Sequence, residues 1–242
     1  MKQIIIAFLC IIALLLSSCS AEKDYSSISS EDSSVEENTP AIIEAETEIK
    51  KPIYVSRLAV ENFLEPFEDY SWEMTEKPEF VVLHFTSAIV LDKQEPFKLD
   101  SVRRIFEDTS VSIHYVIDRD GSILCWLPES RAAWHAGKGT FADNDKYTNS
   151  MNKYSIGIEM LAIGSEKDMK QYLTSKEYNA LDKSYIGFTD AQYASLGELV
   201  RDICERNEIL FDKEHIIGHN EYNPVKSDPG ELFDWDRLFA ED

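Results

Sequence analysis

Basic residues are scarce in this sequence. It holds 24 Lys and Arg against 45 Asp and Glu among 242 residues, which gives a formal net charge of -21 at pH 7. Because a protein that binds nucleic acid needs a basic face to neutralise phosphates, this balance excludes nucleic acid as an expected partner. The acidity otherwise favours solubility and identifies no substrate.

Cysteine is also scarce, with four residues in the chain. Cys10 and Cys19 fall in the first segment, so Cys125 and Cys204 remain for the folded part. An exported protein can form a disulfide between such a pair. Both positions also fit a buried apolar environment, and we favour two free core thiols over a bridge.

No hydrophobic run has the length of about 20 apolar residues that a comfortable membrane-spanning helix needs. The first segment, MKQIIIAFLCIIALLLSSC, has an early lysine, a short apolar middle and small residues at its end. This is the pattern of a secretory signal. Its last four residues, Leu16-Ser17-Ser18-Cys19, resemble a bacterial lipoprotein signal, which is cut before a cysteine that then receives acyl chains.

We therefore expect a lipoprotein signal peptide at residues 1–18 and a lipid anchor on Cys19. The alternative is an ordinary signal peptide that happens to contain this cysteine. The expected location is a bacterial envelope membrane, on the periplasmic side of the outer membrane if the cell is Gram-negative. Residues 19–51 are rich in Ser and Glu, which predicts a disordered tether because little apolar surface is available for burial.

Residues 52–242 have the length of one domain and contain no visible repeat. Their pattern predicts strands interleaved with helices, and therefore an α/β fold with a mixed central β-sheet flanked by α-helices. Strands are expected within residues 80–90, 110–128, 154–164 and 215–219, and helices at 56–64, 100–108 and 189–209. Asp120-Gly121 predicts a hairpin turn, and Thr189 with Gln192 predicts a capping box. Residues 166–187 are polar and are expected as an insertion near the surface.

The loop that begins GHNEYNPVKSDPGELF contains too many Gly, Asn and Pro residues for a helix or a central strand. Such a loop can fold back and aim His219 and Asp228 at one point. Two imidazole nitrogens and one carboxylate oxygen leave a tetrahedral zinc ion with an open position, as in catalytic sites. His84, in a central strand, is the best candidate for the third ligand, although it would fit a structural role if taken alone. Calcium and magnesium prefer shells made entirely of oxygen.

Two more charged residues fit the chemistry of such a site. Lys226 lies two residues before Asp228, so both side chains point the same way in an extended loop, and its charge would suit a developing oxyanion. The alternative is a solvated surface lysine. Glu159 lies within an apolar strand, where a desolvated carboxylate can act as a general base and then as an acid. The alternative is a core glutamate paired with an arginine such as Arg131.

Six segments together resemble zinc N-acetylmuramoyl-L-alanine amidases, whose fold is shared with peptidoglycan recognition proteins and a phage type of lysozyme. In chain order they are VVLHFTSA, SIHYVIDRDGSI, AAWHAG, SIGIEM, DAQYASLGELV and IIGHNEYNPVKSDPGELFDW. They span residues 80–235, and each is a weak motif alone. The resemblance implies a zinc enzyme that hydrolyses the amide between the lactyl group of N-acetylmuramic acid and L-alanine of the stem peptide.

The resemblance also implies a role for each matching residue. His84, His219 and Asp228 are the implied zinc ligands, Glu159 the catalytic carboxylate and Lys226 the residue that stabilises the oxyanion. His135 is the implied contact to substrate in the cleft wall, and Arg131 the implied contact to a peptide carboxylate. Ile113 stands where some members place a catalytic tyrosine, which leaves the proton transfer to Glu159.

Two departures from the family concern the substrate groove. The loop between His219 and Lys226 is one residue shorter than in the common form, and the stretch after Met160 is longer than in minimal members. The alternatives to the enzyme are a non-catalytic muropeptide-binding module on the same fold, or cleavage of a different amide. The expected partners are peptidoglycan or muropeptides and, through the lipid anchor, a membrane; a monomer is expected.

Overall fold

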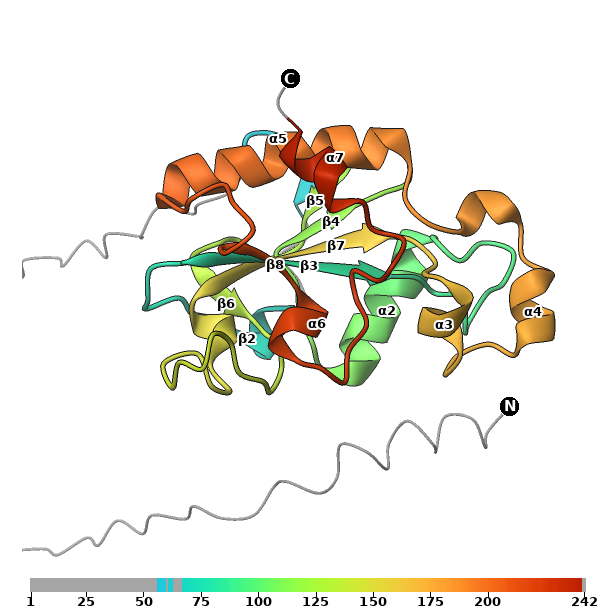
Figure 1. Cartoon of the computed structure of the whole chain (residues 1–242), viewed down its shortest axis with the longest axis horizontal. Helices are drawn as coiled ribbons and strands as arrows, with labels where there is room; N and C mark the ends of the chain where they lie inside the picture. The colour runs from blue at the N-terminus through green and yellow to red at the C-terminus, as the bar shows by residue number, and fades with distance from the viewer. Residues whose placement is uncertain (1–55, 60, 63–66, 241–242) are drawn as a thin grey trace, which may run out of the picture. The chain divides into compact units, whose positions relative to one another are not determined.

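Strand β3 (Phe80–Thr86) lies inside a six-stranded sheet with the order β1-β5-β4-β7-β3-β8 (Figure 1). The computed structural model describes residues 56–59, 61–62 and 67–240. The other strands of this sheet are β1 (Glu61–Asn62), β4 (Tyr115–Ile117), β5 (Ile123–Cys125), β7 (Ser155–Leu161) and β8 (Ile216–Gly218). The expected signal peptide, the tether and Cys19 lie outside the described residues.

The sheet is mixed, as predicted. Strand β3 pairs in parallel with both β7 and β8, β4 pairs in parallel with β7, and β4 and β5 form an antiparallel hairpin. Gly121 in the hairpin turn has a φ of +90°, which glycine adopts without strain. A separate two-stranded antiparallel sheet joins β2 (Ser71–Glu73) to β6 (Arg131–Ala133).

Helices cover both faces of the large sheet. Helix α5 (Asp190–Asn207) covers one face and α2 (Leu99–Thr109) the other. The remaining helices are α3 (Glu166–Met169), α4 (Ser175–Asn179), α6 (His219–Tyr222) and α7 (Trp235–Phe239), with 3-10 helices at Phe67–Tyr70, Met151–Lys153 and Lys183–Tyr185. Among the described residues, no helix combines the length and the apolar character needed to cross a membrane.

The alternation of side chains along the strands determines what each face contains. Val81 and Leu83 of β3 pack with the buried face of α5, which includes Leu196, Leu199 and Val200. Successive residues of a strand point to opposite faces, so Val82 and His84 face away from α5. The site described below lies on that second face.

Most of the predicted elements are confirmed. The helix at 100–108 is α2, and α5 begins with the expected capping box, in which the Thr189 side chain accepts a hydrogen bond from the Gln192 N–H. Cys125 and Cys204 are free and buried. Burial raises the pKa of each thiol to about 12, so both remain protonated.

The predicted helix at 56–64 is wrong in its described part. Glu61–Asn62 instead form β1 and pair in parallel with β5 at the sheet edge. The Ser56 N–H donates to the hydroxyl of Tyr115 at 2.8 Å, so contacts with the sheet hold this segment out of a helix. Tertiary contacts thus override a weak local preference.

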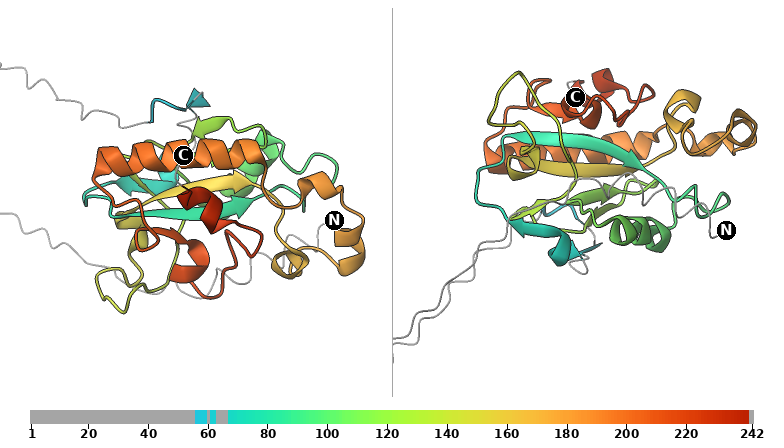
Figure 2. Two further views of the ribbon diagram at one scale, coloured as in Figure 1. Left: turned by 45° about the horizontal axis from the view of Figure 1, so that its top comes forward. Right: turned by 90° about the horizontal axis from the view of Figure 1, so that it is seen from below.

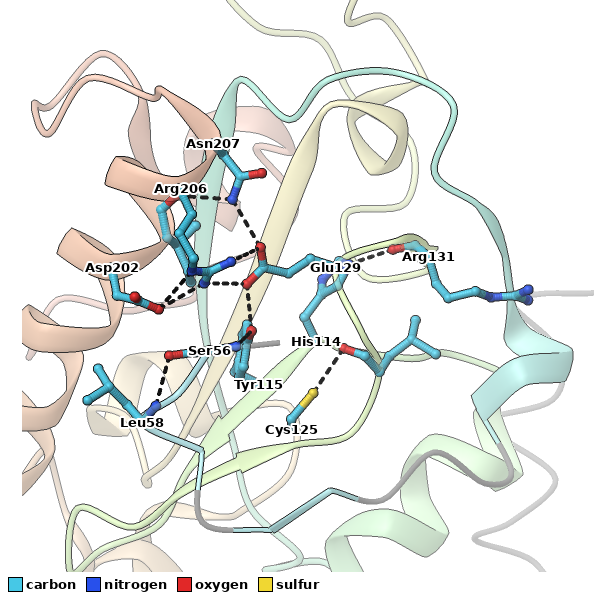
Figure 3. A network of polar contacts seen from close by, with 12 residues as sticks. Ser56, Leu58, His114, Tyr115, Cys125, Glu129, Arg131, Asp202, Arg206 and Asn207 are labelled. Atoms are coloured by element: carbon cyan, nitrogen blue, oxygen red, sulfur yellow. Dashed lines mark hydrogen bonds and ion pairs between the residues drawn. The ribbon is translucent and has the colours of Figure 1, made fainter. Parts of the chain in front are cut away.

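A buried carboxylate ties this first segment to the C-terminal end of α5 (Figure 3). The side chain of Glu129 is 2% exposed and accepts two hydrogen bonds of 2.7 Å from the Arg206 guanidinium. It also accepts bonds from Asn207 at 3.0 Å and from the Tyr115 hydroxyl at 2.5 Å. Because the Tyr115 hydroxyl also accepts from Ser56, the Glu129 carboxylate connects its own loop with β4, with the segment at Ser56 and with the end of α5.

Arg206→Ala should lower the free energy of unfolding by about 3 kcal/mol, because it leaves the Glu129 carboxylate buried without its cation. Urea denaturation measures the change. Arg104→Ala is the control, since Arg104 belongs to an exposed pair with Asp108 at 3.5 Å and should change stability little. Equal losses in the two variants would contradict the assigned importance of the network.

Candidate metal centre

Parallel register places a histidine and a glutamate side by side at the C-terminal ends of two central strands. His84 of β3 is the register partner of Glu159 of β7. Both side chains therefore emerge on the same face of the sheet, the face opposite α5. His84 is 2% exposed and Glu159 is 9% exposed.

The second histidine comes from the neighbouring strand on the other side. Leu83 of β3 is paired with Gly218 at the end of β8, so His219 follows directly beside His84. The loop after α6 then folds back, and the Asn220 N–H donates to the carbonyl of Asp228 at 2.9 Å. This backbone bond returns Asp228 to the strand ends, as the loop composition predicts.

Three side-chain atoms converge here. The Asp228 Oδ2 atom lies 2.8 Å from Nδ1 of His84 and 2.8 Å from Nδ1 of His219. The two Nδ1 atoms lie 3.1 Å apart. The sequence prediction that these three residues meet is confirmed, and among the described residues they form a group able to hold a metal ion.

The hydrogen bond made by the Nε2 atom of each imidazole determines whether its Nδ1 atom carries a proton. The Nε2 atom of His219 lies 2.9 Å from the Ala136 carbonyl oxygen, which only accepts, so Nε2 carries the proton. The Nδ1 atom of neutral His219 is then an unprotonated acceptor. Bonds on the outer nitrogen orient metal-binding histidines in this way.

A longer chain of bonds orients His84 in the same manner. The Ser155 hydroxyl donates to the Met151 carbonyl at 2.8 Å, so it accepts from Nε2 of His135 at 3.1 Å. Neutral His135 then accepts at Nδ1 from Nε2 of His84, at 2.9 Å. The Nδ1 atom of His84 is therefore also a free acceptor.

The electrostatics agree with neutral imidazoles at His84 and His135. Burial, followed by the neighbouring His219, lowers the pKa of His84 to about 4. Burial also lowers the pKa of His135 well below its usual value. The His84 and His135 rings are therefore neutral near pH 7.

The residues present fit a metal ion. Two imidazole lone pairs and a carboxylate oxygen face one another within 3.1 Å, and the outer bonds place no proton between them. Buried acceptors in such contact repel unless a cation lies among them. Two nitrogens and one oxygen are the donor set of a catalytic zinc site with an open fourth position.

Glu159 is unpaired in this setting. Its Oε2 atom is buried and has no hydrogen-bond partner among the described residues. Burial, and then the charge of Asp228, raise the pKa of Glu159 well above its usual value, while Lys226 lowers it. The alternative pairing of Glu159 with Arg131 is wrong, because no hydrogen bond reaches the buried Oε2 atom of Glu159 among the described residues. Arg131 bonds to the Ser71 hydroxyl at 2.8 Å.

The other predicted residues have different surroundings. Lys226 is exposed, and its positive charge acts to lower the pKa of both Glu159 and His84. His135 uses both ring nitrogens to connect His84 with Ser155, and Arg131 lies in β6 against β2. The substrate contacts assigned to His135 and Arg131 stay predictions.

Sequence reasoning did not identify Ser155 or Gly157. Both alternate with Glu159 along β7 and therefore face the site. The two-residue period of SIGIE could have predicted that Ser155 and Gly157 lie on the same face as Glu159. A Cβ atom on Gly157 would lie 2.7 Å from Cγ of His135. Only glycine at this position lets the His135 ring lie against the strand.

Comparison of the sequence with known proteins identifies related chains. The family profile described as N-acetylmuramoyl-L-alanine amidase matches residues 74–231. The 1,6-anhydro-N-acetylmuramyl-L-alanine amidase AmpD of Haemophilus influenzae is 33% identical over 131 residues, which cover 54% of this chain and 58% of AmpD. AmpD of Escherichia coli is 30% identical over 129 residues, or 53% and 56% of the two chains. The chain thus spans little more than half the length of these curated relatives.

Solved structures agree on the fold. A selenomethionine derivative of AmpD has a TM-score of 0.53 at 23% identity and covers 76% of this chain and 94% of its own. AmiD from E. coli, solved with the substrate anhydro-N-acetylmuramic acid-L-Ala-D-γ-Glu-L-Lys, has a TM-score of 0.50 at 28% identity and covers 67% and 56%. Because the family profile matches more than half of the chain, the protein belongs to the N-acetylmuramoyl-L-alanine amidase family.

Proposed function

We propose that this protein is a zinc-dependent amidase that hydrolyses the bond between the lactyl group of N-acetylmuramic acid and L-alanine. The observation that carries the proposal is the convergence of two imidazole nitrogens and the Asp228 carboxylate beside the unpaired Glu159. A recognition module needs no buried base next to its metal. The complete ligand set with Glu159 therefore favours the enzyme over a non-catalytic binding module.

The relatives support a muropeptide substrate with a 1,6-anhydro sugar. AmpD of Haemophilus influenzae is described as acting on this class, and AmiD was solved with an anhydro-muramyl tripeptide. We extend this class to the present chain, with a role in the turnover or recycling of the cell wall. Cleavage of a different amide within the peptide is the competing activity.

The chemistry divides among a few groups. A zinc ion held by His84, His219 and Asp228 would act as a Lewis acid and lower the pKa of water. Glu159 takes the proton from the attacking water and returns it to the departing nitrogen of L-alanine, a role for which its buried carboxylate beside His84 is placed. Lys226 stabilises the negative charge that develops on the lactyl carbonyl oxygen.

We also propose that the enzyme works at a membrane surface, anchored by acyl chains on Cys19. The support is the sequence of the first 19 residues, with its early lysine, apolar middle and final Leu-Ser-Ser-Cys. The acidic residues 19–51 would then hold the domain away from the anchor. The amidase domain would face the cell wall in this arrangement.

The test of the function is the digestion of anhydro-muramyl tripeptide by the zinc-loaded protein, with mass spectrometry of the products. We expect free anhydro-N-acetylmuramic acid and the intact tripeptide. Glu159→Gln should retain zinc and lose about 10²- to 10⁴-fold of the turnover, since the general base is removed. Glu198→Gln, on the exposed side of α5, is the control and should match the wild type.

Other products would redirect the proposal. A cut between two amino acids identifies the competing activity, and a zinc-loaded protein that cleaves no fragment identifies a binding module. Full turnover by Glu159→Gln would show that another group is the base.

His84→Ala should abolish stoichiometric zinc, because it removes one of three ligand atoms. Zinc per protein, measured by mass spectrometry of the metal after gel filtration, gives the result. His215→Ala is the matched control: this histidine is hydrogen-bonded to Asp212 at 2.7 Å, outside the site. Retention of one zinc per chain by His84→Ala would contradict the ligand set.

A further inference from the structure

The segment between β7 and α5 is a structured unit. Residues 163–187 contain α3, α4 and a 3-10 helix, and both α-helices begin with a capping box. Their apolar side chains form a cluster with residues of the loop after β3, composed of Ile89, Ile163, Met169, Leu173, Tyr178 and Leu181. The sequence prediction of a polar surface insertion therefore describes only the outer side of this segment.

This unit packs directly on the loop that carries Asp228. A Cβ atom on Gly230 would lie 2.9 Å from Oδ2 of Asp168 and 3.3 Å from Cε1 of Phe85, the residue after His84. Lys167 also forms an ion pair of 3.3 Å with Glu231. Figure 1 shows α3 beyond the arrowheads of β3 and β7, and both views of Figure 2 keep it at that end of the sheet.

Tyr172 lies between buried neighbours, and its own side chain is partly exposed. Met169 and Leu173 are 3% and 6% exposed, whereas Tyr172 is 42% exposed. The N–H groups of Tyr172 and Leu173 both donate to the Met169 carbonyl, at 2.8 and 2.9 Å. Among the described residues, the Tyr172 hydroxyl has no hydrogen-bond partner.

Tyr172 follows α3, whose Lys167 and Asp168 lie against Glu231 and Gly230 of the loop that carries Asp228. Burial, followed by the charges of Asp228 and Glu159, raises the pKa of Tyr172. A phenol in this position stays neutral and keeps its proton to donate. The Tyr172 hydroxyl is thus an exposed donor without a partner among the described residues, on a segment that packs against the loop of Asp228.

We propose that residues 163–187 form one wall of the substrate site and that the Tyr172 hydroxyl donates a hydrogen bond to the bound muropeptide. This proposal rests on the proposed function. Muropeptides carry acceptor oxygens along both the sugar and the peptide, and a phenol can donate a hydrogen bond to such an oxygen. Because the phenol is neutral, it adds no negative charge to the site. Tyr172 would act as a substrate-contacting residue that leaves the proton transfer to Glu159.

The experiment compares Tyr172→Phe with the wild-type zinc-loaded protein on anhydro-muramyl tripeptide. Loss of one hydrogen bond should lower kcat/KM about five- to tenfold, mainly through a higher KM, because the contact already exists in the bound substrate. Zinc content and the midpoint of thermal unfolding should not change. Tyr147→Phe is the matched control from outside this segment, since its hydroxyl donates to the Glu79 carboxylate at 3.0 Å.

A binding assay separates this proposal from the proposed function. In the Glu159→Gln background, calorimetry should show that Tyr172→Phe weakens binding of the same tripeptide about five- to tenfold, even if the wild type cuts nothing. Equal affinity with and without the Tyr172 hydroxyl would overturn the contact while leaving the amidase proposal in place. Absence of binding by every variant would overturn both.

Discussion

The placement of protons around two imidazole rings is the constraint on which the site depends. The Ala136 carbonyl accepts from His219, and the Met151 carbonyl orients Ser155, then His135, then His84. Each outer bond leaves an unprotonated Nδ1 atom facing Asp228. These buried hydrogen bonds hold three acceptor atoms close together, an arrangement that a bound cation would stabilise.

The sheet separates stability from chemistry by its two faces. Side chains of β3 and β7 that point toward α5 form a dry apolar core, while those on the opposite face carry His84, Glu159 and Ser155. The site lies at the carboxyl ends of parallel strands, where open α/β sheets commonly place their ligands. Two further segments contribute to the site: the loop after β8, which carries Asp228, and the segment after β7, which contains Tyr172.

Much of this was predictable because it depends on local pattern. The strand periods, the Asp120-Gly121 turn and the Thr189 capping box are short-range signals, and the composition of the loop after His219 indicates that Asp228 returns to the site. The role of His135 was not predictable, because its two partners come from β3 and β7. The β1 pairing and the packing of Asp168 on Gly230 are likewise tertiary contacts that leave no mark on local sequence. For the same reason, the polar pattern of residues 166–187 does not reveal that this segment packs against the loop of Asp228.

The most direct test of the central claim is a crystal structure of the zinc-loaded protein with anomalous data collected at the zinc edge. The account predicts one zinc ion bound by Nδ1 of His84, Nδ1 of His219 and a carboxylate oxygen of Asp228, with Nε2 of His219 still bonded to the Ala136 carbonyl. A zinc ion bound through the Nε2 atoms, or held by other residues while these three side chains point apart, would contradict it.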